Sequence, residues 1–173
     1  MLLMIDADHF KSINDRFGHA AGDRCLTQIA ALLRGVLREG DLAGRLGGEE
    51  FGVFLPAITL YEARFIADRI SRGVVLRVRG VAEPKRVTLS VGMASLRGRT
   101  DLAQVLRRAD AALYRAKDAG RARAVLAPSD EAAATRSGAG PPTTTRIRVE
   151  RCATVPPKSP TGRPPATAAS GPP

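Results

Sequence analysis

Residues 45–55 have the sequence RLGGEEFGVFL, and this stretch decides how the rest of the chain is interpreted. Two glycines, Gly47 and Gly48, separate two short apolar segments, which is typical of the turn of a β-hairpin. Such a turn places Glu49 at its tip, and residues 51–55 then predict a buried strand. Two exposed carboxylates beside a glycine turn contribute little to folding, so the hairpin indicates a functional site.

A second buried strand is predicted for the apolar residues 2–5, which end at Asp6. Asp8 follows two positions later, so both carboxylates can lie on the same side of the strand end. An isolated Asp-x-Asp is more often a turn. If this strand lies beside the strand at 51–55, Asp6 and Glu49 converge, and such carboxylates are the ligands that Mg²⁺ prefers. Two bound ions would activate a hydroxyl nucleophile and neutralise a leaving pyrophosphate.

Three amphipathic helices are predicted from apolar residues at helical spacing. The first runs from about residue 23 to 38, and the third from 101 to about 119. The second carries its own start signal, a capping box of Thr59 and Glu62, and Gly73 is placed to end it.

Residues 86–93 alternate apolar with small or polar side chains, which predicts a strand packed on one face, with residues 74–78 as its antiparallel neighbour. The resulting order is strand, helix, hairpin, helix, strands, helix. This order favours an α+β fold, in which a central, mostly antiparallel sheet is flanked by helices.

The composition limits the possible functions. The chain has 173 residues, enough for one compact domain, and no apolar run approaches the roughly 18 to 20 residues that span a bilayer. The net charge of +10 suggests an anionic partner, but a solvated arginine-rich surface explains it equally well. Aromatic residues make up only 4%, which favours a nucleotide ligand over single-stranded nucleic acid. Cys25 and Cys152 lie too far apart to indicate a disulfide framework or a metal site, so a reducing cytoplasm fits best.

The composition changes near residue 127, where Pro, Thr, Ala, Gly, Ser and Arg begin to dominate. A segment of this kind buries too little apolar surface to offset its ordering entropy. We therefore expect a folded domain over residues 1–126 and a disordered tail over 127–173.

Four blocks of the sequence resemble the GGDEF family of diguanylate cyclases. They are DADHFKSINDRFGHAAGD at 6–23, GGEEF at 47–51, TLSVGMA at 88–94 and ADAALYRAKDAGR at 109–121. The resemblance covers residues 1 to about 126. It implies a palm-like nucleotidyl cyclase fold and a homodimer that condenses two GTP into cyclic di-GMP and two pyrophosphates.

The resemblance also implies roles for individual residues. Mg²⁺ or Mn²⁺, with two ions per active site, would be held by Asp6, the backbone carbonyl of Ala7, and Glu49. Glu49 or Glu50 would help to deprotonate the ribose 3′-hydroxyl. Asn14 and Asp23 would recognise guanine, since Asp accepts from the base donors and Asn offers both functions.

Further roles rest on weaker signals. His19 would line the guanine pocket, although a helix-start histidine satisfied by backbone is nearly as plausible. The cations that would contact the triphosphate are Lys11, Lys117 and Arg121. Lys117 could instead belong to a solvated helix face.

The segment Arg38-Glu39-Gly40-Asp41 fits the RxxD site at which family members bind their product and are inhibited, and Arg69 matches a further arginine of that site. Short motifs of this kind also recur by chance. An alternative function is a non-catalytic cyclic di-GMP receptor that uses this site. A module that binds nucleic acid without specificity is a third alternative, and it would show a steep salt dependence.

The family's usual helical lead-in, a DxLTGLxNR-like segment before the first strand, is absent from this sequence. We therefore expect an N-terminally truncated domain without a sensory module or a membrane segment. Without its flanking helix the sheet would expose apolar surface.

Overall fold

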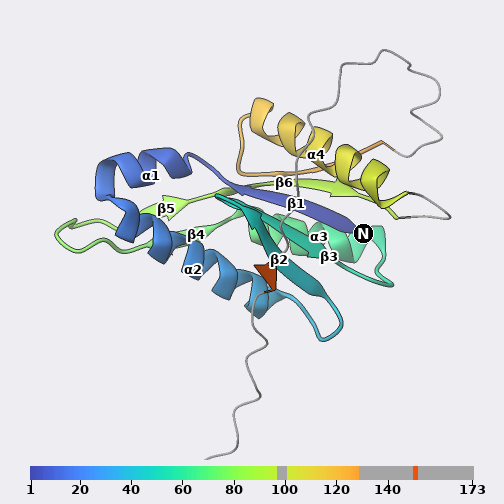
Figure 1. Cartoon of the computed structure of the whole chain (residues 1–173), viewed down its shortest axis with the longest axis horizontal. Coiled ribbons are helices and arrows are strands. Elements are labelled where there is room, and N and C mark those ends of the chain that lie inside the picture. Colours follow the sequence, from blue (N-terminus) through green and yellow to red (C-terminus); the bar gives the residue numbers. More distant parts are fainter. Residues whose placement is uncertain (97–100, 129–149, 152–173) are drawn as a thin grey trace, which may run out of the picture.

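The structure is a computed structural model that describes residues 1–96, 101–128 and 150–151. A six-stranded sheet forms its centre, in the order β7-β6-β1-β3-β2-β8 (Figure 1). All neighbouring strands are antiparallel except β6 and β7, which are parallel. The predicted α+β fold with a mostly antiparallel sheet is therefore confirmed. The strands are β1 (Leu2–Ala7), β2 (Leu42–Gly47), β3 (Glu50–Phe54), β6 (Leu89–Ala94), β7 (Ala124–Leu126) and β8 (Glu150–Arg151).

Helices cover both faces of this sheet (Figure 1). On one face, Leu3 and Ile5 of β1 join a core with α1 (Phe10–Phe17), α2 (His19–Val36) and α3 (Leu60–Ser71). On the other face, Leu2 and Met4 pack with α4 (Leu102–Asp118). Alternate side chains of a strand point to opposite faces, so β1 is buried along its whole length.

The contact between α4 and β6 depends on Gly92. A Cβ atom at this position would lie 2.1 Å from the carbonyl oxygen of Ala109 and 2.3 Å from the backbone nitrogen of Leu113. The backbone of α4 therefore rests directly on the strand, at a distance that only glycine permits.

The prediction of one continuous strand over residues 86–93 is wrong. Thr88 interrupts it, and β5 (Lys85–Val87) instead pairs with β4 (Val74–Leu76) in a separate two-stranded sheet. The expected antiparallel pairing with residues 74–78 is confirmed. The expected packing on one face is wrong for β6, which is buried throughout because helices cover both sides of the main sheet.

The helices also differ in part from the prediction. The first predicted helix begins at His19 rather than near residue 23, and α1 before it was not predicted. The capping box is confirmed, since the Thr59 hydroxyl accepts from the Glu62 backbone at 3.2 Å and Glu62 accepts from the Thr59 backbone at 2.9 Å. Asp101 caps α4, as the third predicted helix requires.

Most of the predicted disordered tail lies outside the described residues. Within it, Glu150 and Arg151 form β8 and pair with Arg45 and Gly44 of β2. Along the part of the chain that the structure describes, none of the helices has the length and apolar character needed to cross a bilayer.

Candidate active site

The candidate site lies where the end of β1 is beside the start of β3. Asp6 is directly opposite Glu50 in the antiparallel register, and the backbone N–H of Ala7 donates to the carbonyl of Glu49 at 3.3 Å. The guanidinium of Arg45 donates twice to the carbonyl of Gly48, at 2.8 and 2.6 Å, and so braces the turn between β2 and β3. The predicted hairpin and the predicted neighbourhood of Asp6 and Glu49 are both confirmed.

Asp6 is a buried carboxylate with one cationic partner. Only 9% of its side chain is exposed, and its Oδ2 lies 2.8 Å from Nζ of Lys117 at the end of α4. Burial raises the pKa of Asp6; the hydrogen bond and charge of Lys117 oppose this shift, and the nearby charges of Glu49 and Asp8 add to it. The site therefore holds more negative charge than its own groups neutralise, which suits a cationic ligand.

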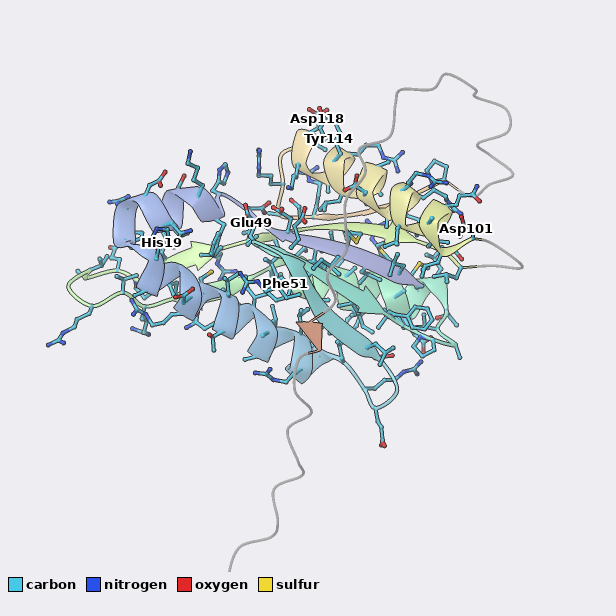
Figure 2. The ribbon with its side chains drawn as sticks, viewed as in Figure 1. His19, Glu49, Phe51, Asp101, Tyr114 and Asp118 are labelled. Atoms are coloured by element: carbon cyan, nitrogen blue, oxygen red, sulfur yellow. The ribbon has the colours of Figure 1, made fainter. Side chains whose placement is uncertain are left out.

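The neighbouring glutamates share this environment. Burial also raises the pKa of Glu50, and the charge of Asp6 adds to the shift. Glu49, at the turn, is half-buried. Figure 2 shows Glu49 at the end of the sheet below the C-terminal end of α4, where Tyr114 and Asp118 are labelled. A raised carboxylate pKa beside further carboxylates is typical of a group that exchanges protons or binds a cation.

Asp8 differs from Asp6 because its carboxylate is fully engaged inside the fold. Its carboxylate accepts hydrogen bonds from the hydroxyls of Thr88 and Ser90, each at 2.7 Å, and from the backbone of Ala122 at 3.1 Å. Both Asp8 oxygens thus have partners inside the fold, and these contacts do not favour Asp8 as a metal ligand beside Asp6.

The predicted guanine contact Asn14 lies where α1 packs on α2. The Asn14 side chain is half-buried there, and its Oδ1 has no hydrogen-bond partner among the described residues. Gly22 makes room for it, because a Cβ at Gly22 would lie 2.0 Å from that oxygen. A buried polar atom without a partner is costly, and here the oxygen lies against Gly22, so the role of Asn14 in binding guanine stays a prediction.

The other predicted nucleotide contacts are exposed. Asp23 and His19 lie on the first turns of α2, and among the described residues no hydrogen bond or ion pair joins either of them to Asn14. Figure 2 places His19 at the junction of α1 and α2. Lys11 is exposed on α1, and Arg121 is exposed in the loop after α4. The structure brings Asp6, Ala7, Glu49, Glu50 and Lys117 together. Nucleotide contacts by Lys11, His19, Asp23 and Arg121 stay a prediction.

A separate groove of about 320 Å³ contains Arg38, Asp41 and Arg69 together. Arg38 donates to the carbonyls of Pro56 and Ala57 at 2.9 and 3.3 Å, and its backbone donates to Asp41 at 3.0 Å. This groove lies between the C-terminal end of α2 and one face of α3, and none of Asp6, Glu49 and Glu50 lines it.

Two aromatic residues of this groove were missed by sequence reasoning. Tyr61 and Phe65 line it, and they are 82% and 59% exposed. Tyr61, Phe65 and Arg69 follow one another at intervals of four residues, which puts all three on one face of α3. This spacing was the signal available in the sequence. A larger cavity of about 640 Å³ lies near Met1 at the opposite end of β1, and no predicted site residue lines it.

Comparison with known proteins agrees with this architecture. Residues 1–123 match the family model described as "Diguanylate cyclase, GGDEF domain". Two curated relatives are Diguanylate cyclase DgcP of Pseudomonas aeruginosa, 45% identical over 130 residues, and Diguanylate cyclase DgcM of Escherichia coli strain K12, 43% identical over 126 residues. Each alignment covers 73% of this chain, but only 19% of DgcP and 30% of DgcM.

Solved structures give the same result. The active GGEEF domain of a diguanylate cyclase from Vibrio cholerae superposes with a TM-score of 0.67 at 34% identity, covering 75% of this chain and 83% of that one. The GGDEF domain of DgcB from Caulobacter crescentus, solved in complex with c-di-GMP, gives a TM-score of 0.67 at 34% identity, covering 74% of this chain and 75% of that one. The chain therefore belongs to the GGDEF domain family, and its fold is that of a nucleotidyl cyclase.

Proposed function

We propose that this chain is the catalytic domain of a diguanylate cyclase, which condenses two GTP into cyclic di-GMP and two pyrophosphates. The observation that carries the proposal is the buried Asp6 carboxylate, which lies opposite Glu50 and one residue from the Ala7–Glu49 hydrogen bond, with a lysine 2.8 Å away. The GGEEF sequence of the turn is intact, and relatives at 43–45% identity carry the name diguanylate cyclase.

The donor set fits a hard divalent cation. Asp6 already attracts the ammonium of Lys117, its pKa is raised by burial and by neighbouring carboxylates, and the Ala7 carbonyl and Glu49 lie beside it. Oxygen ligands of this kind are those that Mg²⁺ or Mn²⁺ takes at polyphosphate sites. Asp6, the Ala7 carbonyl and Glu49 would hold two such ions, whose chemistry is to acidify a ribose hydroxyl and neutralise pyrophosphate.

The remaining residues bind and orient the nucleotide. Asn14, whose Oδ1 is unsatisfied, and Asp23 recognise the guanine edge, with His19 at the rim of the pocket. Lys11, Lys117 and Arg121 supply positive charge to the triphosphate. Glu49 or Glu50 accepts the proton of the attacking 3′-hydroxyl, a role that the raised pKa of Glu50 suits.

One domain offers one nucleotide site, whereas the product joins two GTP molecules. We therefore propose that the active form is a homodimer in which two such sites face each other, in the cytoplasm where GTP is available. Positioning two bound substrates then supplies much of the rate enhancement.

The test is cyclic di-GMP formation from GTP and Mg²⁺, measured by chromatography, with Glu49→Gln, Asp6→Asn and the wild type compared. Each substitution keeps the side-chain size but removes a charge at the site, and we expect a loss of at least roughly 100-fold. Arg107→Gln, on the exposed face of α4, is the control and should retain wild-type turnover. Unchanged turnover in both site variants would refute the metal assignment.

Product inhibition is proposed for the groove of Arg38, Asp41 and Arg69. Arginine donors there suit the phosphates or guanine edges of cyclic di-GMP. Arg38 also braces the Pro56–Ala57 loop, so Arg69→Ala is the cleaner variant. Losing a charge-assisted contact should weaken inhibition by roughly 10- to 100-fold while leaving initial rates intact. Superimposable inhibition curves for both proteins would exclude the groove.

The second candidate function is a cyclic di-GMP receptor without catalysis, which the same groove would support. Calorimetry separates the two functions. Binding of cyclic di-GMP with no turnover of GTP in the wild-type protein would favour the receptor.

A further inference from the structure

Asp8 is a buried charged group that the proposed reaction does not use. It is 4% exposed, and both of its carboxylate oxygens are occupied. Oδ1 accepts from the Ser90 hydroxyl, and Oδ2 accepts from the Thr88 hydroxyl and from the backbone N–H of Ala122. The Asp8 backbone donates to the Thr88 carbonyl at 3.0 Å. One side chain thus links the end of β1, the start of β6 and the loop after α4.

The loop that Asp8 holds has an unusual backbone. Gly120, Arg121 and Ala122 follow one another with φ values of +100°, +60° and +49°. For a residue with a Cβ, this left-handed region is unfavourable, and two such residues in a row persist only where surrounding contacts impose them.

Further hydrogen bonds besides the one to Asp8 hold the loop conformation, and three of them are short. The Arg121 N–H donates to the Ala116 carbonyl at 2.9 Å, the Arg123 side chain donates to the Arg121 carbonyl at 2.9 Å, and the Val91 N–H donates to the Arg123 carbonyl at 2.9 Å. Of the four, the bond from Ala122 to Asp8 alone connects this loop to the strand that ends in Asp6 and Ala7.

We infer that Asp8 is a positioning residue that fixes the loop of Arg121 relative to the strand end of Asp6. Arg121 is exposed and adjacent to the anchored Ala122, so the direction of its side chain depends on that anchor. A nucleotide that contacts both the carboxylate end of β1 and Arg121 is bound well only if the distance between them is fixed. The nucleotide part of this inference rests on the proposed function.

The loop itself can be tested without any nucleotide. Hydrogen exchange of the Ala122 amide should be at least about tenfold faster in Asp8→Ala than in the wild type, because the amide loses its acceptor. Ser90→Ala is the matched control, since Ser90 bonds the other carboxylate oxygen, and it should leave this amide protected. Asp8→Asn retains an acceptor and should restore protection.

If Asp8→Ala does not fold, Asp8→Ser takes its place, because a serine side chain is too short to reach Ala122. Equal Ala122 exchange rates in the wild type and the shortened variant would overturn the inference. So would an Asp8→Asn variant that exchanges as fast as the shortened one.

The consequence for binding is tested by calorimetry with a non-hydrolysable GTP analogue and Mg²⁺. Asp8→Ala and Arg121→Ala should each weaken binding by about tenfold, and the double variant should be no weaker than Arg121→Ala alone, because Asp8 acts through Arg121. Additive losses, or full affinity in Asp8→Ala, would overturn the inference. A wild-type chain that binds no GTP would instead refute the proposed function, and the exchange measurement would still decide the role of Asp8.

Discussion

Asp6 and Asp8 lie two residues apart at the end of the same strand, and both are buried, yet their surroundings are opposite. Asp8 accepts three hydrogen bonds from three different residues. Among the described residues the Asp6 side chain has one partner, Lys117, and its pKa is raised because burial outweighs that partner. A carboxylate whose oxygens are all occupied stabilises the fold, whereas one left short of donors is available to a ligand.

This difference shows how one chain segment serves two purposes. Asp8 connects elements that are 80 or more residues apart in sequence. Asp6 is a carboxylate whose ionised form is disfavoured by burial, at the place where a cation and a nucleotide are expected. Under the proposed function, stability and catalysis would therefore depend on neighbouring residues of the same type. Three measurements of stability in metal-free buffer can break or sharpen this contrast.

The largest effect is expected for Asp8→Ala. The substitution leaves two hydroxyls and one N–H without their acceptor, which should lower the free energy of unfolding by about 3 kcal/mol and the melting temperature by roughly 10 °C. Asp15→Ala, on the exposed side of α1, is the control and should shift the melting temperature by little. Equal shifts in the two variants, measured by thermal unfolding, would remove the structural role of Asp8.

A smaller effect is expected for Lys117→Met. Without its cation, Asp6 is buried and unpaired, so the free energy of unfolding should fall by about 1 kcal/mol at neutral pH. The loss should shrink as the pH falls through the native pKa of Asp6, because a protonated carboxyl needs no cation. Urea unfolding across this pH range measures the effect, with Arg107→Met as the control on the same helix. A loss independent of pH would mean that Lys117 stabilises α4 without acting on Asp6.

The smallest effect, and the only gain, is expected for Asp6→Asn. A raised native pKa means that the folded state binds the proton more tightly than the unfolded state, so ionised Asp6 lowers stability above that pKa. Removing the charge should raise the free energy of unfolding by about 0.5 kcal/mol at neutral pH, and the gain should vanish below about pH 3, where Asp6 is protonated in both states. A clear loss in chemical denaturation would show that Asp6, like Asp8, supports the fold.

The sequence was sufficient for the parts of the fold that local chemistry determines. The glycine turn before Glu49, the capping box at Thr59 and the apolar run after Met1 each predicted their element. Because β1 and β3 pair with each other, the convergence of Asp6 and Glu49 also followed from the sequence.

Other features depend on partners that no local pattern reveals. α1 is only eight residues long with two buried side chains, Phe10 and Ile13, which is too short for a periodic signal. The strand at 86–93 divides at Thr88, whose carbonyl and hydroxyl both bond to Asp8. The role of Asp8 was hidden for the same reason, since its donors are supplied from residues 88, 90 and 122.

The glycine at position 92 has a consequence for mutational tolerance. Because the backbone of α4 rests on Gly92 with no side chain between them, even one methyl group there has to lift the helix away from the sheet. Lys117 lies in the last turn of α4 and contacts Asp6, so moving α4 would also change the position of Lys117 relative to Asp6. An alanine at position 92, inconspicuous in a sequence comparison, would thus act as a distant loss-of-function variant, whereas the exposed outer face of α4 should accept substitutions freely.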